Sequence, residues 1–95
     1  MTEEITYEYY KTKDIFNIYT NTPIGIKTKS NNKIKIKYNP NKKIHQIQLT
    51  NASQYNIDFI HDILTEISID SEDNMLYLDI VTYNQGMYLL KFDLT

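Results

Sequence analysis

Residues 24–38 alternate strictly between two kinds of side chain, and this pattern restricts the fold more than any other feature of the sequence. Ile, Thr or Tyr occupies every second position on both sides of the polar residues 30–32, and Gly or Lys lies between them. A period of two places successive side chains on opposite faces of a β-strand. The segment therefore predicts a β-hairpin with one apolar face and one basic face.

The register of this hairpin decides where its lysines lie. A two-residue turn at Asn31-Asn32 would place Lys29 opposite Ile34 and mix the two kinds of side chain. A three-residue loop instead pairs Lys29 with Lys33, which keeps the apolar groups together. This register predicts a lysine face, which consists of Lys27, Lys29, Lys33, Lys35 and Lys37.

Two further segments predict strands of the same sheet. Residues 4–10 and 14–20 are rich in Ile, Tyr and Thr and are separated by a short polar stretch, which indicates a hairpin. Residues 43–50 follow the turn signal Asn39-Pro40 and continue as a strand. A four-residue loop would pair Ile34 with Ile47 and Ile36 with His45, and would place Gln46 and Gln48 on the lysine face.

The C-terminal region predicts one more hairpin, with strands at residues 75–83 and 87–94. A three-residue loop that ends in a left-handed Gly86 pairs Leu78 with Phe92 on the core face. On the other face the turn end is apolar and includes Tyr83 and Met87. Such a tip is either a buried strand end or an exposed patch for a partner.

Between the two β regions, the period changes. Ile57, Ile60, Leu64 and Ile67 recur at helical spacing after a capping signal at Asn51, and they predict one α-helix over about residues 52–68. The opposite side of that helix would carry Asp58, Asp62 and Glu66 at successive i+4 steps. With Glu72 and Asp73 of the following loop, these residues form the alternative, acidic partner-binding surface.

Charge is segregated along the chain, although the total is only −2. Residues 15–57 hold seven Lys and no acid, whereas residues 58–95 hold eight acids and one Lys. Opposite fields of this kind favour association with charged partners. The excess of Ile, Asn, Lys and Tyr also indicates an AT-rich genome, so that not every Lys reflects function.

Several classes of protein are disfavoured. The chain has no Cys, which excludes disulfides and thiolate metal sites. His61 near Asp58 and Asp62 has metal-ligand chemistry, but no second cluster completes a site, so we expect neither a metal nor a cofactor. Neither a catalytic triad nor a phosphate-binding loop is recognisable. No signal peptide or membrane span is apparent, which predicts a cytoplasmic protein without membrane contact.

Together these patterns predict an α+β fold in one domain over residues 1–95, with an antiparallel sheet of six to seven strands and one helix packed on it. We expect a small non-enzymatic protein-binding module. An inhibitor or immunity-type protein from a phage or other mobile element, with an anti-defence role, fits its size and coding bias. The alternatives are a module that binds nucleic-acid backbone through the lysine face and a subunit of a larger assembly.

Overall fold

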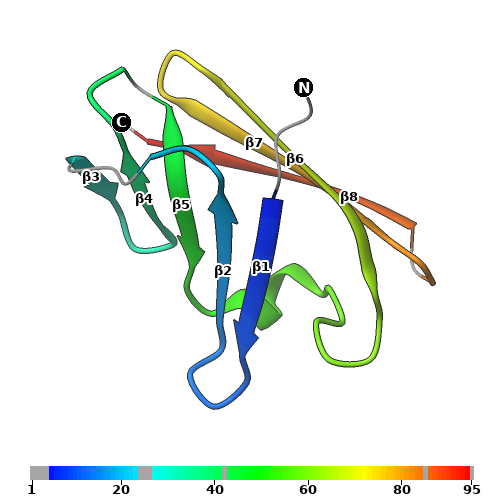
Figure 1. Cartoon of the computed structure of the whole chain (residues 1–95). Coiled ribbons are helices and arrows are strands. Elements are labelled where there is room, and N and C mark those ends of the chain that lie inside the picture. Colours follow the sequence, from blue (N-terminus) through cyan, green and yellow to red (C-terminus); the bar gives the residue numbers. More distant parts are fainter. Residues whose placement is uncertain (1–4, 24–26, 42, 85, 95) are drawn as a thin grey trace. The chain divides into compact units, whose positions relative to one another are not determined.

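The computed structural model describes residues 5–23, 27–41, 43–84 and 86–94. In this part of the chain, eight β-strands form two antiparallel sheets, and a single-turn 3-10 helix, η1 (Ala52–Tyr55), follows the first sheet (Figure 1). The chain divides into two compact units, Met1–Tyr55 and Asn56–Thr95. The antiparallel β architecture is confirmed, whereas the predicted α+β class is matched only roughly. The prediction of one domain over residues 1–95 stays a prediction.

The first unit is a five-stranded sheet in the order β1-β2-β5-β4-β3. Its strands are β1 (Ile5–Tyr10), β2 (Ile15–Thr20), β3 (Lys27–Ser30), β4 (Ile34–Tyr38) and β5 (Ile44–Leu49). The predicted N-terminal hairpin is confirmed, with Tyr7 opposite Ile18. Because side chains alternate along each strand, one face gathers the apolar residues. The fully buried members of this face are Phe16, Ile18, Ile34, Ile47 and Leu49.

The register predicted for residues 24–38 is wrong. Lys29 lies opposite Ile36 and Lys27 lies opposite Tyr38, so both lysines share the face of the buried isoleucines. The side chain of Asn31 is the cause, since its Oδ1 accepts hydrogen bonds from the backbone N–H groups of residues 33 and 34, at 2.8 and 3.1 Å. This side-chain turn shifts the pairing by three residues, so that Lys29 faces Ile36 and not Lys33, and an odd shift changes the face of the strand. The edge position of β3 makes the arrangement tolerable, because long lysine stems at an edge can extend to solvent.

Pairing between β4 and β5 also differs from the predicted register, but each side chain of the two strands lies on the predicted face of the sheet. Ile36 lies opposite Ile47, and Ile34 lies opposite Leu49, which is a shift of two residues. An even shift leaves every side chain on its original face. A bulge between Lys37 and Tyr38 accommodates the change.

The second unit is a three-stranded sheet with β7 (Met75–Thr82) between β6 (Leu64–Glu72) and β8 (Gly86–Asp93). Leu76, Leu78 and Ile80 of the central strand are fully buried. In the final hairpin Leu78 lies opposite Leu90, again two residues from the prediction, and Gly86 has the expected positive φ of 95°. The turn begins one residue earlier than predicted, at Tyr83, whose N donates to Ile63 O at 2.9 Å and so extends the pairing with the chain before β6.

The predicted helix over residues 52–68 is wrong. Asn51 and Asn56 adopt φ values of 50° and 61°, and these left-handed residues confine the helical turn to η1. From Leu64 onward the chain is strand β6, in which Ile67 and Ile69 alternate with polar residues and pair with β7. The helical spacing of residues 57, 60, 64 and 67 therefore spans two different local structures.

Candidate functional site

The face of the first sheet opposite its buried isoleucines carries two continuous rows of polar side chains, which we call the polar face. Cross-strand pairing defines each row from β1 to β3. The first row is Thr6, Tyr19, Gln46, Lys37 and Thr28, and the second is Glu8, Asn17, Gln48, Lys35 and Ser30. The expected position of Gln46 and Gln48 beside lysines is confirmed.

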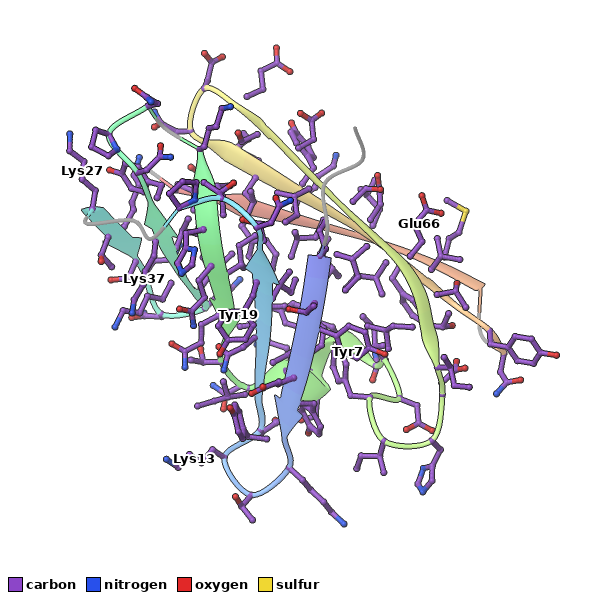
Figure 2. The ribbon with its side chains drawn as sticks, in the orientation of Figure 1. Tyr7, Lys13, Tyr19, Lys27, Lys37 and Glu66 are labelled. Atoms are coloured by element: carbon purple, nitrogen blue, oxygen red, sulfur yellow. The ribbon has the colours of Figure 1, made fainter. Side chains whose placement is uncertain are left out.

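The structure divides the predicted lysine face. Lys35 and Lys37 lie on the polar face, whereas Lys27 and Lys29 lie on the opposite face of the same sheet. Lys33 is exposed in the β3–β4 turn. Figure 2 marks Tyr19, Lys27 and Lys37 on this sheet. Whether these residues bind a partner stays a prediction, but they do not act as one face.

Sequence reasoning did not place Tyr10, Asn17 or Tyr19 on the polar face. Tyr19 is half-buried and lies opposite Gln46, whose Nε2 donates to Asn17 Oδ1 at 3.4 Å. Tyr10 projects to the same face and its hydroxyl donates to Glu8. This hydrogen bond to a carboxylate raises the pKa of Tyr10 to about 12. The period-two pattern of residues 15–20 places Asn17 and Tyr19 on one face of their strand, but only the sheet order shows that this face adjoins the polar residues of β5 and β4.

The predicted acidic surface is also divided. Glu66 and Glu72 lie on β6 and project to the face opposite the buried leucines, where Asp70, Asp79 and Asp93 join them. Asp73 is exposed in the β6–β7 turn, with a φ of 55°. This acidic face arises from strand alternation and not from an i+4 helical stripe.

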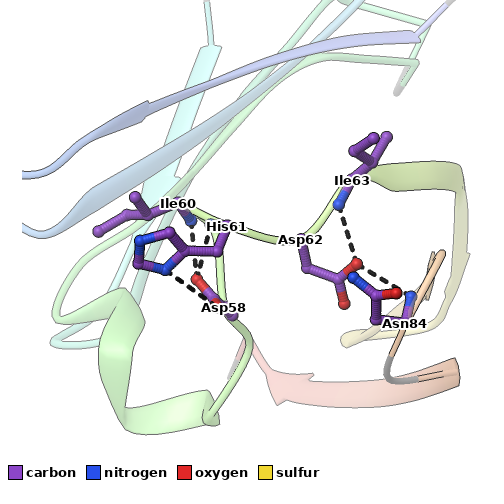
Figure 3. A network of polar contacts seen from close by, with 6 residues as sticks. All are labelled: Asp58, Ile60, His61, Asp62, Ile63 and Asn84. Atoms are coloured by element: carbon purple, nitrogen blue, oxygen red, sulfur yellow. Dashed lines mark hydrogen bonds and ion pairs between the residues drawn. The ribbon is translucent and has the colours of Figure 1, made fainter.

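Asp58 and Asp62 shape the loop before β6 (Figure 3). Asp58 Oδ1 accepts from the backbone N–H groups of Ile60 and His61, and these bonds hold its pKa below the ordinary value. His61 Nδ1 lies 3.3 Å from Asp58 Oδ2. Asp62 is buried, and its Oδ1 accepts from Ile63 N and Asn84 N. In the described residues, no group of three or more His, Cys, Asp or Glu side chains could hold a metal ion.

The turn end of the β7–β8 hairpin is exposed and is not a buried strand end, whereas binding of a partner there stays a prediction. Tyr83 and Met87 are each 77% exposed, Ile63 is 64% exposed and Leu89 is 59% exposed. Val81, which is half-buried, lies opposite Met87 on the same face. We call the four exposed residues the apolar end. They border the acidic face of the same sheet, since Leu89 lies opposite Asp79.

Comparisons with known proteins identify no relative. No protein-family model matches the chain, and neither the curated proteins nor the solved structures contain a match. A search of the described residues for membrane-spanning helices finds none with the required length and apolarity.

Proposed function

We propose that the protein is a small non-enzymatic protein-binding module that acts by covering a surface of its partner. The observation that carries this proposal is the apolar end, where four large side chains are more than half exposed on one hairpin and the adjoining residue Ile63. A contiguous apolar patch framed by polar residues is typical of protein-interaction sites. A module of this kind would block whatever its partner does at the covered surface, as an inhibitor or immunity-type protein does.

The chemistry around the apolar end indicates the kind of partner. Tyr83 and Met87 offer large contact areas, and aromatic residues and Met are enriched at interfaces. Residues 56–95 contain eight acids and one Lys, and five of the acids lie on the same sheet face as the apolar end. A complementary partner therefore presents an apolar surface with a basic rim, because like charges across an interface oppose binding.

The proposal is tested by capture of partners from a lysate of the native host, followed by calorimetric titration of each purified candidate. We expect Leu89→Glu to weaken binding of the true partner at least tenfold, because the change buries a charge in the interface. The matched control is Thr12→Glu, which introduces the same charge at an exposed position of the β1–β2 turn and should bind like the wild type.

Two results would contradict the proposal. If Leu89→Glu and Thr12→Glu bind a purified partner equally well, the apolar end is not the binding surface. If every captured protein fails to bind in the purified system, the protein-binding function itself is wrong. Circular dichroism of each variant separates lost binding from lost folding.

A further inference from the structure

We propose that the polar face of the first sheet binds single-stranded nucleic acid, with phosphates over β4 and bases over β5 and β2. This surface belongs to the first unit and is separate from the apolar end, which belongs to the second unit. The inference therefore goes beyond protein binding and is tested independently of it.

The positive and negative charges of the polar face lie toward opposite edges of the sheet. Lys35 and Lys37 lie two residues apart on β4, which separates their Cα atoms by about 6.7 Å along the strand. Glu8 lies at the far end of the second row, on β1. Anionic phosphate is therefore attracted to one side of the face and repelled from the other, which fixes the path of a bound backbone. The surroundings add to this field, because residues 1–55 contain nine Lys and four acids, a net charge of +5.

Stacking and hydrogen-bonding groups lie beside these cations. Tyr19 is two strands from Lys37 in the same row, about 10 Å away at the usual strand spacing. Gln46 lies between them, and Gln48 occupies the equivalent place in the second row. An aromatic ring next to a basic track, with amides that can donate to and accept from base edges, is the combination used by single-strand binders.

The same groups favour a single strand over a duplex or an acidic protein. A base can stack on the ring of Tyr19 only if its own faces are free, and the bases of a duplex are already stacked. An acidic protein would be attracted by the lysines but has no planar bases for Tyr19 to stack on. A contribution of Tyr19 to the binding free energy therefore distinguishes a single strand from a duplex and from an acidic protein.

Fluorescence anisotropy with labelled DNA and RNA single strands of about 12 nucleotides tests the proposal at low and at physiological salt. We expect the double variant Lys35→Glu/Lys37→Glu to weaken binding at least tenfold. Its matched control is Lys27→Glu/Lys29→Glu, which makes the same charge change on the opposite face of the same sheet. The control should retain binding within about threefold, because only long-range charge is altered.

A second pair of variants tests stacking. Tyr19→Ala should weaken binding about 5- to 150-fold, which corresponds to the loss of one aromatic–base stack, whereas Tyr19→Phe should bind nearly as the wild type does. Leu89→Glu should leave nucleic-acid binding unchanged.

The inference is wrong if neither single strand binds at low salt, if the two double-lysine variants lose binding equally, or if Tyr19→Ala binds as the wild type does. Preference for a duplex, or for an acidic polypeptide of equal charge, would also overturn it. Circular dichroism confirms that each variant is folded.

Discussion

Replacement of Asp62 by Ala should destabilise the protein strongly, although the change removes one acid from a unit with a net charge of −7. Asp62 is 7% exposed, and its Oδ1 accepts from Ile63 N at 2.9 Å and from Asn84 N at 3.0 Å. The first bond lies within the loop before β6, and the second connects that loop to the β7–β8 turn. A hydrogen bond to a charged group contributes about 1.5–3 kcal/mol to stability. Part of the contribution of the two bonds to Asp62 can be recovered in the variant, because water can bind the freed N–H groups. We therefore expect the free energy of unfolding to fall by about 2–4 kcal/mol.

Urea unfolding followed by circular dichroism measures this change. Asp62→Asn keeps a carbonyl acceptor and should lose about half as much free energy. The control is Asp70→Ala, which removes the same charge from an exposed position of β6 and should alter stability by less than about 0.5 kcal/mol. If Asp62→Ala is no less stable than Asp70→Ala, the two backbone hydrogen bonds do not hold this loop in place.

Three further changes have distinct expected outcomes. Leu78→Ala, at a fully buried position of the central strand, should destabilise by about 3 kcal/mol in urea unfolding, whereas Leu89→Ala should change stability by less than about 0.5 kcal/mol; similar losses would contradict the assigned faces. Gly86→Ala should lower the free energy of unfolding by about 1–2 kcal/mol, because Ala adopts a φ of 95° only with strain. A Cβ at this position would meet nothing within 4 Å, so no steric clash adds to the loss. An unchanged urea midpoint would refute this strain. Asp14 accepts hydrogen bonds from Ser53 Oγ and Tyr9 OH, which lower its pKa, so this carboxylate stabilises the fold above its ordinary pKa and stops doing so as the pH falls. Urea midpoints measured between about pH 5 and pH 3 should therefore fall more steeply for the wild type than for Asp14→Asn, and parallel curves would argue against the assignment.

The positions of every described strand except β6 could be predicted from the sequence, but the registers of three of the hairpins could not. Alternation of side chains fixes which residues share a face, and it correctly placed Gln46 and Gln48 with Lys35 and Lys37. Register depends on turn geometry, which side-chain hydrogen bonds alter. Asn31 closed its turn through two backbone N–H groups, and this shifted Lys29 to the apolar face. A three-residue shift of register at this one turn was enough to divide the predicted lysine face.

The predicted helix failed for a local reason of the same kind. Ile57, Ile60, Leu64 and Ile67 satisfied a helical period, but Ile67 also belonged to an alternating segment that could pair with β7. Asparagine tolerates the left-handed conformation better than most residues, and Asn56 adopts it immediately after η1. Strand pairing then gave residues 64–72 backbone partners that an isolated helix turn could not match.

Charge segregation connects the sequence to both proposed surfaces. The change in sign along the chain falls close to residue 56, where the second unit begins, so each unit carries most of one charge. Within each unit, strand alternation then places part of that charge on the sheet face away from the buried apolar residues: Lys35 and Lys37 in the first unit, and Glu66, Asp70 and Asp79 in the second. Binding of an anionic polymer to the first unit and of a basic, apolar surface to the second should consequently respond to salt through different residues. A charge reversal confined to one unit should weaken one interaction and leave the other nearly unchanged.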